Sequence, residues 1–561
     1  MKLLRLKITD PRGFRSLQPG FEYLFRSEWG LKEEHGFAPF VCAGSNGSGK
    51  SNLLEALAAI FFHLDCKSLN YRPELFEYDS ENVPGGFREE VAIPDGFELE
   101  YLSKSFPEFV ASGNIQQPHI KIVKAADTGP QFFILNGTGF DQDASLDSRL
   151  VKAVLPDFVV AYSSGENEIL SLPFFKMRFI HFDEYLDSLR KETPYTGTPE
   201  GRLVFLDQDF NQAILLSNFI LGDPWHLAPF KEEMALDGIK YFRIILKDIL
   251  YPSGLGISTD SKGQWPLLEN ARSVQKKLRQ CASAHFYNSD GDMHYLDYWL
   301  DEECKKAFAL HFGTALELFR SLQLLLTLNL YSVSNPQKLE MYQSQSLYVN
   351  ETIPILPADQ RVIRFKDVVL LKSGVNATVY SKALSDGENQ FLHTLGICTL
   401  YRDSDVLFLL DEPDTHFNPD WRSQFITRLK QCLPDDSESG RHEMLITTHT
   451  PFLISDSKPD KVLVFKKDET TGDVSISRPD YNTLGASINK ITMETFHKQE
   501  TIGLHANQIL RDLLDDPAAQ NDPHALAKRI IETIGDSIER TLAVQSVLAN
   551  SRHPKFRDES D

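Results

Sequence analysis

The stretch 44-GSNGSGKS-51 decides the fold, because it fits the pattern G-x-x-x-x-G-K-[ST] in full. It lies between a short apolar run at 40–43 and apolar, helix-forming residues at 52–62, which predicts a buried strand, a loop and a buried helix. Glycines in such a loop let backbone N–H groups close around phosphates, and the N-terminus of the following helix adds partial positive charge. We therefore predict nucleotide binding by eight consecutive residues: Gly44, Ser45, Asn46, Gly47, Ser48, Gly49, Lys50 and Ser51.

A second motif supplies the acids that such a site needs. The apolar run 406–410 predicts a buried strand, and Asp411 and Glu412 follow it directly. Acids at the carboxyl end of a buried parallel strand face the phosphate crevice, where Asp411 is expected to hold Mg²⁺ through water and Glu412 to polarise the attacking water. In the same scheme, Lys50 reaches the β- and γ-phosphates and the Ser51 hydroxyl holds Mg²⁺. A capped strand end is the structural alternative for the two acids.

Two further motifs flank this strand. His449 follows the strand-like run 443–447, which places it to contact the γ-phosphate; a purely structural histidine is the alternative. The run 384-LSDGENQ-390 comes before the strand and is predicted to open a helix. Four motifs therefore occur in the order phosphate loop, 384–390, Asp411 with Glu412, and His449.

This order resembles the ABC-type ATPases of the RecF and SMC group. In that group, the serine and glycine of the signature motif contact the γ-phosphate bound by the opposite head, which is why ATP drives two heads together. The resemblance implies that Ser385 and Gly387 bind ATP in trans. Asp386 stands where transporter signatures usually carry glycine, a change common in the resembled group. The resemblance also implies ATP hydrolysis, with Mg²⁺ as the cofactor and with three catalytic residues: Lys50, Glu412 and His449.

Other patterns are weaker. The run 13-GFRSL-17 is similar to the N-F-R-S element of the same group, which would place Arg15 near the nucleotide or DNA; a surface arginine is the alternative. A second Ser-Gly-Glu-Asn string at 164–167 is interpreted as a strand-end turn. The acidic turn at 288–292 lacks the spacing and terminal glutamate of a calcium loop. The glutamine that the group carries after its first helix stays open among four candidates: Gln116, Gln117, Gln131 and Gln142.

The predicted fold class is α/β, an ABC-type P-loop NTPase head split by a large mixed α+β insert and followed by a helical tail. Short strand-like runs with frequent proline and glycine reach about residue 265, and helical spacing follows to about residue 330. No sustained heptad pattern occurs, so a long coiled-coil arm is not expected. The predicted parts are the N-terminal part of the head at 1–62, the insert at 63–380, the C-terminal part of the head at 381–482 and the tail at 483–561.

Composition limits the partners and the cellular setting. The formal net charge of -21 argues against a surface coated with nucleic-acid-binding groups, although a basic groove remains compatible with it. Two basic stretches, at 2–26 and 272–279, are candidates for such a groove, and solvated faces are the alternative. The sequence has no run of about 18 apolar residues, no recognisable signal peptide and no Cys-x-x-Cys pair. We therefore expect a reduced, cytoplasmic setting and no membrane partner.

The resemblance covers about a quarter of the chain and implies a class of function. A head split by a globular insert, without a long coiled coil or a nuclease of its own, is similar to ATPases encoded beside restriction, Septu, retron and other anti-phage systems. This implies a homodimer or higher oligomer that senses DNA and controls a separate nuclease, such as an HNH protein. The alternative is a DNA-repair or chromosome-maintenance ATPase without a nuclease partner. A transporter subunit is disfavoured, because transporter ATPases do not normally carry so large an insert.

Overall fold

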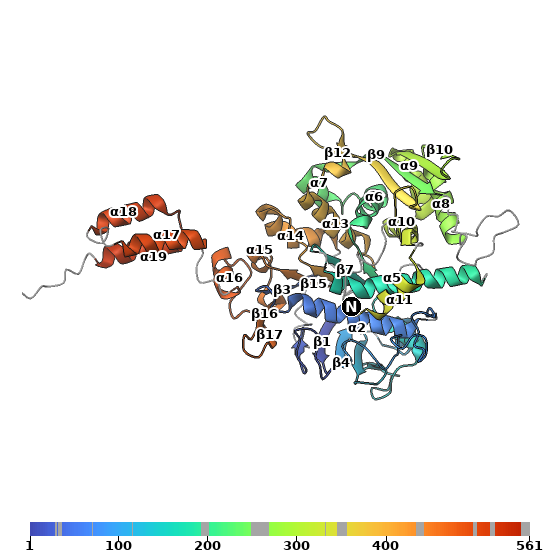
Figure 1. Cartoon of the computed structure of the whole chain (residues 1–561), viewed down its shortest axis with the longest axis horizontal. Helices are drawn as coiled ribbons and strands as arrows, with labels where there is room; N and C mark the ends of the chain where they lie inside the picture. Colours follow the sequence, from blue (N-terminus) through green and yellow to red (C-terminus); the bar gives the residue numbers. More distant parts are fainter. Residues whose placement is uncertain are drawn as a thin grey trace, which may run out of the picture. The chain divides into compact units, whose positions relative to one another are not determined.

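The structure is a computed structural model of the chain, traced in Figure 1. The chain divides into two compact units, one formed by Met1–His449 with Asp460–Arg478 and the other by Thr450–Pro459 with Pro479–Asp561. The described residues are 1–27, 31, 36–69, 71–114, 116–165, 167–191, 201–247, 269–330, 333–344, 356–433, 442–496, 502–516 and 522–550.

Among these residues, the first unit contains a seven-stranded sheet in the order β17-β16-β3-β15-β14-β7-β8. Neighbouring strands run parallel except for the edge pair β16 and β17. Strands β3, β14 and β15 are buried along their whole length, which explains the apolar runs in β3 and β14 and the apolar centre of β15. The strands are β3 (Phe40–Gly44), β7 (Phe158–Ser163), β8 (Leu203–Phe205), β14 (Val406–Asp411), β15 (His442–Thr448), β16 (Val462–Lys467) and β17 (Val474–Ser477).

The strand order brings the sequence motifs to one edge of the sheet. Strand β15 lies between β3 and β14, and all three run in the same direction. Their carboxyl ends, at Gly44, Asp411 and Thr448, therefore meet at the same edge, as ligand sites in parallel sheets do. The strands predicted around the phosphate loop, the acidic pair and the histidine are confirmed. Strands β7 and β8 come from the segment predicted as an insert, so part of that segment belongs to the central sheet.

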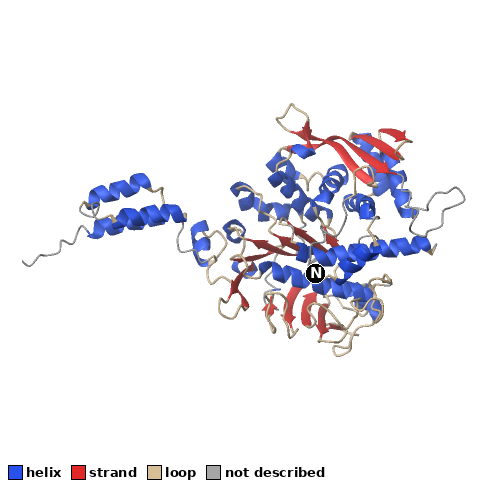
Figure 2. Ribbon diagram, in the orientation of Figure 1, coloured by secondary structure: helices blue, strands red, loops and turns tan. Residues whose placement is uncertain are grey.

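Helices cover this sheet, as Figure 2 shows. Helix α2 (Lys50–Ser68), predicted from the apolar run after the loop, packs against β3, β14 and β15 and against α5 (Glu168–Arg190). Helix α13 (Asp386–Leu400) packs against α6 (Asn211–Leu221) and α14 (Pro419–Cys432). The remaining helices of this unit are α3 (Pro107–Ala111), α4 (Ser148–Val154), α7 (Ala228–Met234), α8 (Glu269–Cys281), α9 (Glu302–Phe312), α10 (Ala315–Thr327) and α11 (Asn335–Gln343).

A second sheet of the first unit is antiparallel, in the order β2-β1-β4-β5-β6. Its strands alternate buried and half-buried residues, the pattern expected of a sheet with one face on the core. The strands are β1 (Lys2–Ile8), β2 (Glu22–Leu24), β4 (Phe97–Leu102), β5 (His119–Lys124) and β6 (Gln131–Ile134).

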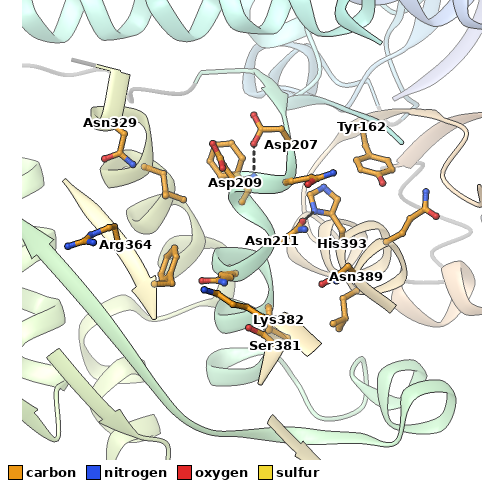
Figure 3. A pocket seen from close by; sticks show the side chains of 18 of the residues that line it. Tyr162, Asp207, Asp209, Asn211, Asn329, Arg364, Ser381, Lys382, Asn389 and His393 are labelled. Atoms are coloured by element: carbon orange, nitrogen blue, oxygen red, sulfur yellow. Dashed lines mark hydrogen bonds between the residues drawn. The ribbon is translucent and has the colours of Figure 1, made fainter. Parts of the chain in front are cut away.

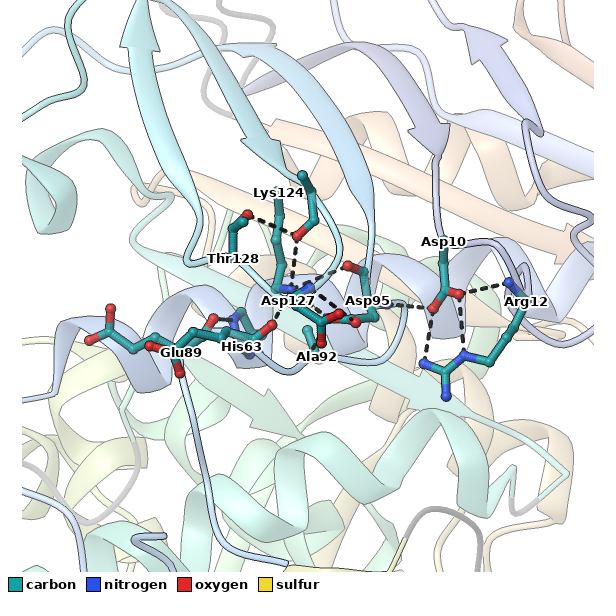
Figure 4. A network of polar contacts seen from close by, with 11 residues as sticks. Asp10, Arg12, His63, Glu89, Ala92, Asp95, Lys124, Asp127 and Thr128 are labelled. Carbon is teal, nitrogen blue, oxygen red and sulfur yellow. Dashed lines mark hydrogen bonds and ion pairs between the residues drawn. The ribbon is translucent and has the colours of Figure 1, made fainter.

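A buried polar network closes one end of this second sheet (Figure 4). The Lys124 side chain is fully buried, and its Nζ atom donates to Asp95 Oδ1 at 2.6 Å and to the Glu90 carbonyl at 2.8 Å. Asp10 accepts from the Asp95 backbone N–H at 2.6 Å and pairs with Arg12. Each buried charge therefore has a partner, the condition under which such groups are tolerated.

Replacing Lys124 with methionine is expected to lower the free energy of unfolding by about 3–5 kcal/mol, because Asp95 would lose its buried cation. Chemical denaturation followed by intrinsic fluorescence measures this change. Lys121→Met on the same strand is the matched control, since Lys121 lies 3.8 Å or more from its partners and is partly exposed. The control should cost less than about 1 kcal/mol. Equal losses in the two variants would contradict the importance of the buried pair.

A third sheet corrects part of the predicted secondary structure. Helical spacing was expected throughout 266–330, but β10 and β11 form a hairpin there, and the acidic turn at 288–292 joins them. The run 293-MHYLDYW-299 alternates half-buried and buried residues, a period of two that determines a strand. Conversely, helices α5 and α6 occupy the segment predicted to be strand-rich. The sheet order is β10-β11-β9-β12-β13, with β9 (Leu236–Lys247), β10 (Ala284–Asn288), β11 (Met293–Trp299), β12 (Ile363–Lys372) and β13 (Val379–Tyr380).

The second unit is helical, which confirms the predicted helical C-terminal segment. Its small core joins the last three helices through residues such as Leu510, Leu526 and Ile530. Throughout the described part of the chain, no helix is both long enough and apolar enough to span a membrane. The helices are α15 (Pro451–Ser455), α16 (Ile488–Glu494), α17 (Leu504–Asp515), α18 (Pro523–Thr533) and α19 (Ile538–Asn550).

Candidate nucleotide-binding site

The loop 44–51 joins β3 to α2 and holds a buried lysine. Lys50 is 5% exposed, and its Nζ atom donates to the carbonyl oxygens of Gly44 at 3.2 Å and Ser45 at 3.0 Å. Burial lowers the pKa of Lys50, against the opposing attraction of Glu412 and Asp411. A desolvated cation held by two neutral carbonyls can exchange those contacts for phosphate oxygens, which accept charge-assisted hydrogen bonds.

The geometry of the loop also fits a phosphate. Gly49 has φ 95°, and a Cβ at this position would lie 2.8 Å from Ser16 Oγ and 3.0 Å from Val474. Only glycine suits this position, where the loop turns into the helix. Ser48 Oγ is buried and has no hydrogen-bond partner among the described residues, although buried hydroxyls usually have one. This hydroxyl and the N-terminus of α2 therefore match an anion in the loop.

A hydroxyl and a carboxylate suited to Mg²⁺ lie beside the lysine. Ser51 Oγ donates to Asp411 Oδ1 at 2.8 Å, and Thr447 Oγ1 donates to the same atom at 2.7 Å. Asp411 Oδ2 accepts from Asn167 Nδ2 at 3.0 Å. Hard oxygen donors of this kind are the ligands that Mg²⁺ prefers, in a site completed by phosphate and water. The residues present therefore fit the predicted metal.

Asn167 is a site residue that the sequence did not reveal. It follows β7, the neighbour of β14, so it lies at the same edge of the sheet as Asp411. Its Nδ2 atom also donates to Glu55 Oε1 on α2 at 3.1 Å. The glutamine candidates that the structure describes lie elsewhere, around the antiparallel second sheet. The Ser-Gly-Glu-Asn string at 164–167 is the sequence signal that could have pointed to Asn167. Ser164 and Gly165 form the expected turn, and Asn167 contacts Asp411. Glu166 lies outside the described residues.

Glu412 adopts a constrained backbone conformation beside His449. Its φ of 52° is left-handed, which is uncommon for a residue other than glycine. Thr447 Oγ1 accepts from the Glu412 N–H at 2.9 Å, and this hydrogen bond stabilises the conformation. His449 Nε2 lies 2.6 Å from Glu412 Oε1, and this hydrogen bond holds the pKa of Glu412 below its ordinary value. His449 Nδ1 lies 3.5 Å from Lys50 Nζ, so the predicted catalytic residues form one cluster.

The predicted signature residues begin helix α13 and lie outside this cluster. Ser385 is the N-cap: its Oγ accepts from the Glu388 N–H at 3.3 Å, and Glu388 Oε2 accepts from the Ser385 N–H at 2.9 Å. Lys372 pairs with Glu388 at 2.7 Å and supports this capping box. Ser385 is exposed and Gly387 half-buried. The start of α13 is therefore accessible to a group from outside this chain.

Gln390, one turn further along α13, joins the signature helix to the loop that carries Glu412. Its Oε1 atom accepts from the His416 N–H at 2.8 Å, and its Nε2 atom donates to the Glu412 carbonyl at 3.4 Å. Gly387 permits this close approach, because a Cβ there would lie 2.7 Å from the His416 carbonyl oxygen. Hydrogen bonds of Gln390 therefore join helix α13 to the loop that carries Glu412.

The run 13–17 contributes a serine to the loop and an exposed arginine near α2. Ser16 Oγ donates to Asn52 Oδ1 on α2 at 2.5 Å. Arg15 is exposed and has φ 57°. Its charge acts on Glu55 of α2, and its role stays a prediction.

Part of the chain is similar to a known domain family. A family model described as "AAA domain, putative AbiEii toxin, Type IV TA system" matches residues 306–455, which include the signature, Asp411, Glu412 and His449. The phosphate loop lies upstream of the matched residues, at the end of β3, which is the neighbour of β15 in the same sheet. Over the matched residues the chain is similar to an AAA domain.

Individual proteins resemble the chain more distantly. Protein ea59 of Escherichia phage lambda is 30% identical over 109 residues, which span 18% of this chain and only 20% of that protein. The SMC head domain from Thermotoga maritima is 11% identical with a TM-score of 0.31, covering 86% of this chain and 100% of that chain. The recombination mediator protein RecF is 15% identical with a TM-score of 0.28, covering 84% and 97%.

A large cavity of the first unit lies beside α13 (Figure 3). Its volume is about 840 Å³, and Asn389, Gln390 and His393 of α13 form one wall. Asp207 and Arg364 line other walls, and burial raises the pKa of Asp207 to about 6. No described residue that lines the cavity belongs to the phosphate loop, but Gln390 and His416 do line it, so the cavity borders the loop that carries Glu412.

Proposed function

We propose that this chain binds ATP with Mg²⁺ and hydrolyses it to ADP and phosphate. The observation that carries the proposal is the cluster at the carboxyl edge of the central sheet, where the Ser51–Asp411 and Glu412–His449 contacts lie beside Lys50. A phosphate-binding cation, a metal-binding pair and a carboxylate acceptor are the groups that phosphoryl transfer to water requires.

Each residue of the cluster receives a distinct role in this proposal. Lys50 offsets charge on the β- and γ-phosphates, and Ser51, Asp411 and Asn167 hold or orient the hydrated metal. Bound Mg²⁺ supplies positive charge to the phosphate oxygens. Glu412 accepts a proton from the attacking water, since its lowered pKa keeps the carboxylate ionised at neutral pH. His449 orients Glu412 and contacts the γ-phosphate.

The direct experiment is a phosphate-release assay on the purified chain. Turnover should require Mg²⁺ and stop when EDTA is added, because the phosphate charge would lose its counter-ion. Absence of turnover together with absence of nucleotide binding would overturn the proposed function. Binding without turnover would leave an ATP-operated switch that needs a further activator.

We further propose that two heads close on ATP, with Ser385 and Gly387 of one head completing the site of the other. The exposure of the α13 start supports this, because a residue acting in trans must be accessible. The signature resemblance also supports it. Because ATP is expected to bring the heads together, light scattering with and without ATP measures the change in oligomeric state.

The biological setting that we propose is nucleic-acid sensing in anti-phage or restriction-linked defence, with a separate nuclease as the effector. The family description supports it by naming a toxin of a toxin–antitoxin system. DNA repair or chromosome maintenance is the alternative. Plasmid incubated with the purified chain and Mg²⁺ should stay intact under this proposal, and cleavage abolished by a substitution in this chain would contradict it.

Gln390→Leu is expected to lower turnover about 10-fold or more while nucleotide affinity changes less than about threefold. Leucine keeps the bulk of glutamine but cannot hydrogen-bond the Glu412 and His416 backbone, so the carboxylate would lose its position. Steady-state kinetics and equilibrium nucleotide binding separate the two effects. Gln390→Glu retains the acceptor for the His416 N–H and should fall between leucine and wild type. Wild-type turnover in Gln390→Leu would rule out a positioning role.

A further inference from the structure

The third sheet of the first unit carries four aromatic side chains on one face, two exposed and two half-buried, here called the aromatic face: Tyr241 on β9, Phe286 on β10, and Tyr295 and Trp299 on β11. Phe286 is 65% exposed and Trp299 57% exposed. Large aromatic side chains gathered on a surface mark an interaction site more often than an ordinary solvated face.

Strand register places these four side chains on the same side of the sheet. Phe286 lies opposite Tyr295, and Trp299 lies opposite Tyr241. The ring centroids are 6.1 Å apart in the first pair and 4.7 Å apart in the second. Four residues along β11 separate the two pairs, about 13 Å, so each pair can receive a separate planar group.

The opposite side of the same sheet belongs to the core. Phe242 and Tyr298, which alternate with the aromatic face, stack at 4.5 Å between ring centroids. The Tyr298 hydroxyl donates to the Leu278 carbonyl of α8 at 2.9 Å. Figure 1 shows β9, β10 and β12 grouped with helices α8, α9 and α10. The inward residues therefore pack into the core, whereas Phe286 and Trp299 on the other side remain exposed.

Cations accompany the aromatic face. Asp297 lies between the two pairs, where its charge is offset by Arg243, 2.6 Å away at Nε, and its Oδ1 atom also accepts from the Tyr241 hydroxyl at 2.6 Å. The nearby Asp367 is the second carboxylate that acts on Arg243. Four cations lie in register with the aromatic positions or beside them: Arg243, Lys247, Arg364 and Lys366. The face thus carries a positive excess in a chain whose net charge is -21.

Helix α8 carries further cations, but it packs on the opposite side of the sheet, where the Leu278 carbonyl accepts from the Tyr298 hydroxyl, so the aromatic face relies on the four cations of β9 and β12. Arg279 is close enough to β10 to lower the pKa of His285, after burial and His294. The basic stretch noted in the sequence lies on this helix, with members Arg272, Lys276, Lys277 and Arg279. Basic groups around stacked aromatic residues are the combination that binds single-stranded nucleic acid without strict sequence preference.

We propose that the aromatic face binds a single-stranded segment of nucleic acid, with bases stacked on Phe286 and Trp299 and phosphates held by the neighbouring cations. The inference rests on the proposed function, because that function assumes that nucleic acid is what the ATPase senses. The binding itself requires no nucleotide, so the two ideas can fail separately. A duplex hides the faces of its bases, and therefore should bind this surface more weakly.

The test is fluorescence anisotropy of a labelled oligothymidylate of about 20 nucleotides, without ATP, at low and moderate salt. The double variant Phe286→Ala with Trp299→Ala should bind at least about 10-fold more weakly than wild type. Lys366→Glu should weaken binding and reduce its salt dependence. Trp225→Ala is the matched control, because Trp225 is an 80% exposed aromatic residue between α6 and α7 and is not one of the four residues of the aromatic face. It should leave affinity unchanged.

Three results would overturn the inference. These are no oligonucleotide binding by wild type at about 100 µM, equal affinity in the double variant, or tighter binding of duplex than of single strand at every salt concentration. A change of oligomeric state in the double variant, with oligonucleotide binding unchanged, would instead identify a protein interface. ATP turnover without nucleic acid is measured on the same preparations. Normal turnover in a wild-type chain that binds no oligonucleotide would reject this inference and leave the proposed ATPase intact.

Discussion

Glu412→Gln is expected to lower ATP turnover at least about 100-fold while ATP binding is retained. The amide has nearly the shape of the carboxylate but cannot accept a proton from the attacking water. Its neighbour His449, 2.6 Å away, would still find a polar partner, so the local packing should survive. The proposed closed pair of heads should then persist, because the step that opens it is blocked. Single-turnover hydrolysis and equilibrium binding measure the two quantities.

Lys50→Ala is the contrasting variant for this prediction. Removing a buried cation that faces the phosphates should weaken ATP binding about 100-fold, because its charge acts on the bound nucleotide before chemistry begins. Lys67→Ala is the matched control on the same helix, since Lys67 pairs with Glu89 at 2.9 Å in the last turn of α2. Unchanged hydrolysis in Glu412→Gln would remove Glu412 as the proton acceptor. Wild-type affinity in Lys50→Ala would remove the loop as the phosphate site.

The parts of the site that the sequence predicted are those encoded locally. The loop 44–51 is flanked by its own strand and helix, and β14 and the centre of β15 are apolar runs followed by polar residues. Each of these signals is complete within about ten residues. Their meeting at one edge follows from the general behaviour of parallel strands, so it could also be anticipated.

The parts that were missed depend on contacts between distant segments. Asn167 gains its position because β7 pairs with β14, more than 240 residues away, and no local pattern encodes that pairing. Helix α5 contains Pro173, which in isolation suggests a break. Packing of α5 along α2 overrides this local preference. The β10–β11 hairpin was missed because its period of two covers only a few residues within a longer helical region.

Ser385→Arg is expected to abolish ATP-dependent association of heads while a single head still binds ATP. The phosphate loop is untouched by the change, and Ser385 is exposed at the start of α13, so the fold should tolerate arginine. The bulky side chain would occupy the position proposed for the γ-phosphate of the partner head. Loss of the N-cap costs about 1 kcal/mol, which is small for a helix buried over most of its length. Ser385→Ala is the matched control, because it removes the cap without adding bulk.

Mixing Ser385→Arg chains with Lys50→Ala chains provides the stronger test, because it depends on composite sites rather than on a single motif. In a symmetric pair, one composite site would carry both defects and the other would carry neither. ATP turnover should therefore return in the mixture, to about half the wild-type value per mixed dimer if the sites act independently and to less if they are coupled. Ser385→Arg chains that hydrolyse ATP normally on their own, without any recovery on mixing, would mean that each site is built within one chain.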